Sequence, residues 1–108
     1  MFGIFKPPLF HIRKRIPQHA MLELAAVESF GEMELGDLSE AERQCALAFI
    51  VSVWACNSAV SGKFQLAHKD YLFVQRSGMN AGNWLTPEVQ DRAGAIISDL
   101  TTSGLIPK

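Results

Sequence analysis

The sequence has little net charge and few charged residues of either sign. Its 108 residues include ten Lys or Arg and eleven Asp or Glu, so the net charge is −1 and 19% of the residues are charged. This balance argues against a protein that packages nucleic acid in bulk. Hydrophobic residues make up 48% of the chain, which excludes a disordered tail. A mass of 11.9 kDa leaves room for one hydrophobic core.

Cysteine is scarce, and the two cysteines present do not suggest a disulfide. Cys45 and Cys56 lie eleven positions apart in a segment that we expect to be one helix. That spacing separates them by roughly 16 Å along the helix axis, whereas a disulfide needs Cα atoms within about 7 Å of each other. Both are expected to be reduced, buried and inert, which indicates a reducing compartment.

Motifs for metal binding and catalysis are lacking. The three histidines, His11, His19 and His68, share no i, i+4 spacing, and no cysteine stands near them in the sequence. The chain contains no Gly-x-Ser-x-Gly turn, no phosphate-binding Gly-x-x-x-x-Gly-Lys loop and no Gly-x-Gly-x-x-Gly. We therefore expect no metal, no cofactor and no enzymatic activity.

Targeting signals are also missing from the sequence. No apolar run of useful length lies between Pro7-Pro8 and Arg13-Lys14-Arg15, so a secretory signal is not expected. Phe2 rules out a myristoylation acceptor, and the C-terminal residues include no cysteine for prenylation. The cytoplasm is the expected location.

Charge is present, but it is segregated along the chain. Residues 1–19 carry four bases and no acid, whereas residues 20–42 carry seven acids and no base. The remainder has a net charge of +2. A basic segment followed at once by an acidic one is able to fold back on itself or to pair with a second copy.

Hydrophobic patterning predicts an all-α fold. We expect a basic and aromatic N-terminal arm over residues 1–19, extended because of its prolines, followed by a single helical domain over residues 20–108. Four helices would form a small bundle-like domain around a central apolar helix at about residues 39–61. The predicted helices are 18–30, 39–61, 63–75 and the segment from Pro87 to the stop at Gly104, with loops at 31–38 and 77–84.

The central helix has the clearest start of the four. Ser39 and Glu42 form a capping box, and no charged residue follows from Gln44 to Gly62. Both faces of this segment are apolar, which predicts a helix buried on every side. Its 19 uncharged residues would also span roughly 28 Å, so a membrane span is an alternative, which the polar residues within the segment and the basic residues at both ends disfavour.

Two other segments are locally informative. Thr86 as N-cap, Pro87 at the first helical position and Gly104 as stop define the last helix, with Leu105 expected to pack on Leu100. The segment 63–75 is predicted to be helical, although Tyr71-Leu72-Phe73-Val74 also suits a short strand.

Two groups of residues are candidates for binding a partner. Both combine aromatic anchors with hydrogen-bonding or cationic groups, a mixture found in recognition surfaces. Within the arm, the alternative is that the phenylalanines pack on the domain while the bases meet the acidic segment. For the loop, the alternative is a hinge in which Trp84 and Leu85 close the end of the core. The candidates are Phe2, Phe5, Lys6, Phe10, Arg13, Lys14, Arg15, Asn80, Asn83 and Trp84.

These features predict a non-enzymatic protein–protein interaction or regulatory module of the small adaptor or inhibitor type. Three short neighbours are not expected to cover the central helix fully, so a symmetric homodimer with arm exchange is a further expectation. The alternative function is a peripheral binder of an anionic membrane surface or of nucleic acid, acting through residues 1–19. An integral membrane protein is the third hypothesis, and the sequence favours it least.

Overall fold

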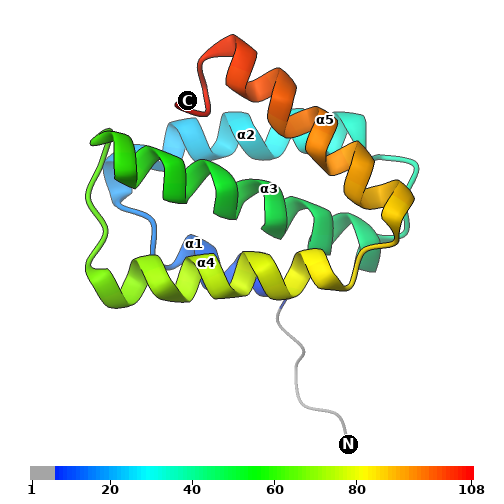
Figure 1. The fold of residues 1–108 in the computed structure, drawn as a ribbon, viewed down its shortest axis with the longest axis horizontal. Helices are drawn as coiled ribbons and strands as arrows, with labels where there is room; N and C mark the ends of the chain where they lie inside the picture. Colours follow the sequence, from blue (N-terminus) through cyan, green and yellow to red (C-terminus); the bar gives the residue numbers. More distant parts are fainter. Residues whose placement is uncertain (1–6) are drawn as a thin grey trace, which may run out of the picture.

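The longest helix, α3 (Glu40–Ser61), runs through the middle of the molecule (Figure 1). The structure is a computed structural model that describes residues 7–108. Over these residues the predicted all-α fold with a long central helix is confirmed. The other elements are α1 (Pro8–Arg13), a 3-10 turn (Gln18–Ala20), α2 (Met21–Glu34), α4 (His68–Asn83) and α5 (Pro87–Ser103).

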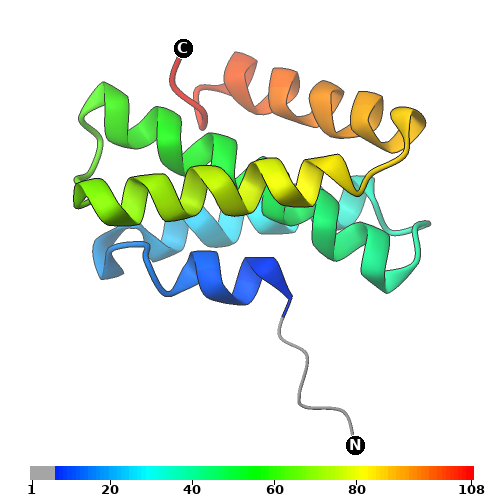
Figure 2. The same ribbon diagram turned by 60° about the horizontal axis from the view of Figure 1, so that its bottom comes forward.

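Helix α3 lies between two pairs of helices. It contacts all four of them, while α1 contacts α4 on one side and α2 contacts α5 on the other. Figure 2 shows α1 and α4 as neighbours, with α5 on the far side of α3. The core is built around α3, where Leu47, Ile50 and Trp54 are at most 1% exposed. Each of the other four α-helices therefore packs against α3.

The ends of α3 match the sequence prediction. The Glu42 amide donates to the Ser39 hydroxyl, which in turn donates to the Glu42 carboxylate. Gly62 ends the helix in the left-handed conformation (φ 88°), which glycine adopts without strain. The prediction that α3 is buried on every side is wrong for part of its surface. Phe49 and Val53 are half-buried, and Val60 is 76% exposed.

Within residues 7–108, α3 is the one helix long and apolar enough to cross a membrane. Core helices of globular domains meet the same criteria, and half of its apolar segment is buried inside the domain. We therefore describe α3 as a core helix.

The arm is not extended where the structure describes it. Pro8–Arg13 forms helix α1, and Leu9, Ile12 and Ile16 are buried in the core. Pro8 occupies the first turn, where its missing N–H is no loss. Six residues do not form a stable helix alone, so the burial of Leu9 and Ile12 against α3 and α4 holds α1 in place.

Helix α2 continues beyond its predicted stop. Gly31 was expected to end it, but the helix runs to Glu34 and residues 31–34 are not a loop. Gly31 is buried against Leu47 of α3, where a Cβ would lie 2.5 Å from the Leu47 Cδ2 atom. Close packing between α2 and α3 thus outweighs the low helix propensity of glycine, about 1 kcal/mol.

Helix α4 differs most from the prediction. Residues 63–67 lie before it, while 71–74 are helical as predicted and do not form the alternative strand. Of the expected loop at 77–84, residues 77–83 belong to the helix. Gly78 and Gly82 bring α4 close to α3, where a Cβ at Gly82 would lie 3.0 Å from the Phe49 ring. These glycines serve helix–helix approach, and the sequence pattern had indicated a turn.

Helix α5 matches its predicted boundaries. The Val89 amide donates to the Thr86 hydroxyl at 3.2 Å, and Gly104 is left-handed (φ 92°). After the helix, Ile106 is fully buried, and its amide donates to the Leu100 carbonyl at 3.1 Å. Leu105, the residue expected to pack there, is half-buried.

Candidate functional site

The described part of the predicted arm packs on the domain. Phe2, Phe5 and Lys6 lie outside the described residues. Phe10 is half-buried on α1, and the Lys14 ammonium lies 4.6 Å from the centre of its ring.

Two arginines that follow one another closely in sequence are held by different helices. Arg13 pairs with Glu28 of α2, and its Nε donates to that carboxylate at 2.8 Å. The hydrogen bonds to Glu28 raise the pKa of Arg13 above its ordinary value. Arg15 donates to Asp70 of α4 at 2.7 Å, and its guanidinium lies 4.1 Å from the Phe73 ring centre. The packing alternative is therefore confirmed for Arg13, which meets the acidic segment, whereas Arg15 meets α4.

The candidates on α4 point in two directions. Asn80 lines the same groove as Arg15, which belongs to the segment predicted to be an N-terminal arm. Trp84, one turn further on, lies on the same side of the helix and is 83% exposed, so the expectation that it closes the core is wrong. Leu85 does close it, being 7% exposed. Asn83 lines a separate groove.

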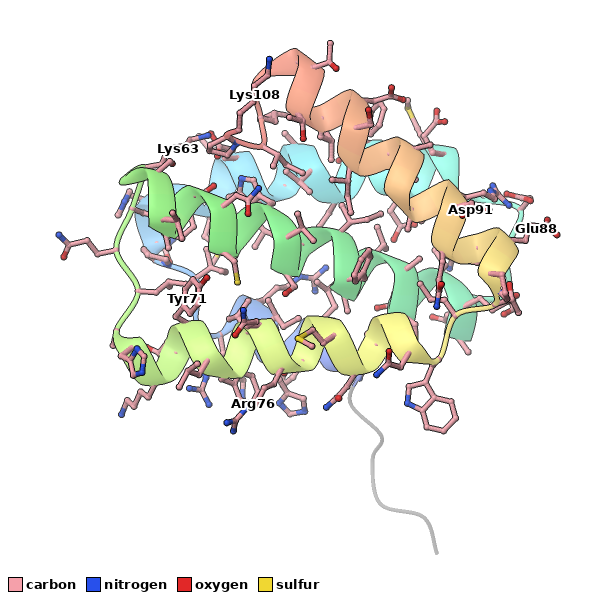
Figure 3. All side chains as sticks on the ribbon, in the orientation of Figure 1. Lys63, Tyr71, Arg76, Glu88, Asp91 and Lys108 are labelled. Atoms are coloured by element: carbon pink, nitrogen blue, oxygen red, sulfur yellow. The ribbon has the colours of Figure 1, made fainter. Side chains whose placement is uncertain are left out.

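A groove along α4, closed on one side by Arg15 of the segment that follows α1, is called here the basic groove and has a volume of about 500 Å³. Figure 3 shows Arg76 on the outer side of α4, away from α3, whereas Tyr71 points toward α3. Three cations and two large apolar side chains share the lining, which suits an anionic ligand with an apolar part. The lining residues are Arg15, Lys69, Leu72, Phe73, Arg76, Ser77 and Asn80.

Two of the cations in the basic groove are available for a ligand. Arg15 is already paired with Asp70, but among residues 7–108 no carboxylate lies within ion-pair distance of Lys69 or Arg76. Both side chains belong to exposed residues on the same side of α4. A carboxylate or phosphate entering the groove would meet these two charges first.

The opposite charge collects where α2 ends and α3 and α5 begin, a region called here the acidic end. Figure 3 places Glu88 and Asp91 at this end of the molecule. Arg92 of α5 donates to both carboxylate oxygens of Asp37, at 2.7 and 2.9 Å, and this pairing lowers the pKa of Asp37. The acidic end comprises Glu32, Glu34, Asp37, Glu40, Glu42, Glu88 and Asp91.

A second groove lies on α3 between α4 and α5 and has a volume of about 380 Å³. It is lined by uncharged residues, namely Phe49, Met79, Gly82, Asn83, Gln90, Gly94 and Ile97. Of the ten predicted site residues only Asn83 belongs to it.

No metal site is formed by the part of the chain that the structure describes: no three His, Cys, Asp or Glu side chains come together. His11, His19 and His68 are all exposed. Cys45 and Cys56 are unbridged, and burial raises the pKa of both thiols, an effect partly offset at Cys56 by a hydrogen bond with Ser52.

The two thiols should react slowly with a disulfide reagent such as DTNB at neutral pH. A raised pKa leaves less of the reactive thiolate, and burial restricts access. In the variants Cys45→Ser and Cys56→Ser, which isolate one thiol each, we expect Cys56 to react more slowly than the half-buried Cys45. Urea should accelerate both. Equal rates with and without urea would contradict this burial.

Sequence reasoning did not single out Lys69, Phe73 and Arg76 as candidates for a binding surface. Their signal was present, because positions 69, 73, 76, 80 and 84 recur at helical spacing along one side of α4. The pattern becomes visible only when residues 77–83 are helical, and the glycines there had indicated a loop.

Comparison with known proteins adds no further constraint on the function of the basic groove. No family model, no curated protein and no solved structure matches this chain.

Proposed function

We propose that this chain is a non-enzymatic protein-interaction module that binds an acidic segment of a protein in its basic groove. The observation that carries the proposal is the arrangement of Lys69 and Arg76, both unpaired among the described residues, beside the apolar side chains Leu72 and Phe73. Such a surface fits a segment that places carboxylates on both sides of an apolar residue. The cations would favour a negatively charged ligand, and the apolar contacts would add affinity.

Charge distribution favours a protein segment over nucleic acid or an anionic membrane. The net charge of the chain is −1, so a long polyanion or an extended anionic surface gains no general attraction beyond the groove itself. Of the four bases in residues 1–19, Arg13 and Arg15 are engaged in internal ion pairs. Half of the bases expected to carry the alternative function are thus already paired within the domain.

The non-enzymatic part of the proposal is supported by the cysteines. Their thiols are the strongest potential nucleophiles of the chain, and burial raises the pKa of both. The cytoplasmic location expected from the sequence stays a prediction.

A labelled peptide rich in glutamate, with one central leucine, tests the groove by fluorescence anisotropy. Arg76→Glu should weaken binding about tenfold, because a favourable charge contact becomes a repulsive one. Arg76 is exposed and unpaired among the described residues, so the variant should stay folded. Raising the salt concentration should weaken binding to the native chain.

Lys108→Glu is the matched control, since it makes the same change of charge at an exposed residue remote from the groove (Figure 3). It should leave the affinity unchanged within about twofold. Equal losses in the two variants would mean general charge attraction and would overturn the proposal. Tighter binding of a DNA oligonucleotide or of phosphatidylserine vesicles, also abolished by Arg76→Glu, would overturn it by making nucleic acid or an anionic membrane the ligand of the groove.

A further inference from the structure

The acidic end includes an exposed apolar residue. Met33 stands between Glu32 and Glu34 in the last turn of α2 and is 75% exposed. Glu32 lies 3.3 Å from Arg43, and its side chain remains 49% exposed. The Glu34 side chain has no ion pair among the described residues. The chain thus presents the pattern of an apolar side chain flanked by carboxylates.

From this complementarity we infer that the acidic segment bound in the basic groove belongs to a second copy of this chain. The inference rests on the proposed function and names its partner. In this arrangement, Met33 of one copy contacts Leu72 and Phe73 of the other, and its neighbouring glutamates face Lys69 and Arg76. A flexible, polarisable methionine makes favourable contacts with an aromatic ring such as Phe73.

The two surfaces do not meet within one molecule. The basic groove lies on the outer side of α4, whereas the acidic end lies where α2 ends and α3 begins (Figures 1 and 3). Helix α3 separates these regions, because α1 and α4 pack on one side of it and α2 packs on another. A second copy is therefore needed to bring them together.

Each copy offers one groove and one acidic end. The contact joins the groove of one copy to the acidic end of another. It therefore produces either an open chain of copies or a closed dimer in which each copy's groove binds the other's acidic end. Its charged pairs would lie near the surface and be screened by salt, so association should be weak and salt-dependent.

Sedimentation velocity on the full chain tests this inference. At a protein concentration of about 100 µM and about 50 mM salt we expect species heavier than the monomer, which should dissociate at about 500 mM salt. Arg76→Glu, which changes the groove, and Glu34→Lys, which changes the acidic end, should each give a monomer. Lys108→Glu, the matched control, should associate as the native chain does.

Mixing the two monomeric variants gives the sharpest result. The Glu34→Lys chain keeps an intact groove and the Arg76→Glu chain keeps an intact acidic end, so one native contact remains between them. The substituted groove and the substituted acidic end also carry opposite charges, so we expect the mixture to associate although neither variant does so alone. A mixture that stays monomeric would overturn the inference, as would association of either variant by itself.

The outcomes for the inference and for the proposed function are separable. If the native chain binds the glutamate-rich peptide but stays monomeric at low salt, the groove binds acidic segments and the inference of a second copy is wrong. If the peptide does not bind and the chain is monomeric, both are wrong.

Discussion

Replacing Trp54 by alanine should unfold the domain or remove most of its stability. Truncation of a buried tryptophan costs about 3–5 kcal/mol, against a total of about 5–15 kcal/mol for a typical domain. Trp54 is fully buried in the middle of α3, at the point where the surrounding helices share one core. The loss should appear as a lower urea midpoint, with no stable native baseline if the domain is at the weak end of that range.

Trp54 has polar as well as apolar contacts. Its indole N–H donates to the Glu23 carboxylate of α2 at 2.8 Å, and its ring centre lies 5.4 Å from that of Phe64. The same carboxylate oxygen accepts from Lys63 at 2.6 Å. Alanine would therefore leave a cavity and remove one of the two donors to Glu23. Trp54→Phe should recover part of the stability by filling the cavity without restoring the hydrogen bond.

Trp84→Ala is the matched control for this prediction. Trp84 is the other tryptophan of the chain and is 83% exposed. Its truncation should change the free energy of unfolding by no more than about 0.5 kcal/mol. Similar urea midpoints for the two alanine variants would contradict the burial of Trp54.

Gly78→Ala should destabilise the domain by about 2 kcal/mol. In an isolated helix the same substitution is favourable by about 1 kcal/mol, because alanine has the higher helix propensity. Here the new Cβ would clash with the side chain of Ser52 and lie 3.7 Å from its Cα. Ser52 is buried, and its hydroxyl donates to the Val74 carbonyl at 2.9 Å, so it has little freedom to move. The packing of α3 against α4 would have to loosen.

Gly94→Ala should change the free energy of unfolding in the opposite direction to Gly78→Ala. Gly94 also lies inside a helix, α5, but no atom of another element lies within 4 Å of the position its Cβ would take. Its replacement should stabilise the domain by up to about 1 kcal/mol. Thermal and urea unfolding of both variants would show the contrast. Stabilisation by both substitutions would mean that α3 and α4 do not approach closely at Gly78.

The two helices that were predicted with correct limits carry their signals locally. Ser39 and Gly62 mark the ends of α3, and Thr86 and Gly104 mark those of α5. A capping side chain satisfies amides two or three residues away, and a left-handed glycine ends a helix whatever surrounds it. The sequence by itself therefore determined the helical class, the central position of α3 and the extent of α5.

Packing between distant segments decided the rest. Helix α1 is held by the burial of Leu9 and Ile12, and α4 remains helical through Gly78 because that glycine faces α3. Local propensity alone favours extended chain in the first case and a turn in the second. Contacts formed only in the folded domain outweigh these preferences, which are worth about 1 kcal/mol each.

The candidate site divides in the same way. Arg15 and Asn80 were singled out in the sequence as members of separate binding segments, and composition was sufficient for that. Only the packing of the segment after α1 against α4, where Arg15 pairs with Asp70, places them in one groove, together with Lys69 and Arg76. Residue type is a property of the sequence, whereas the joint charge of a surface depends on which segments the hydrophobic core brings side by side.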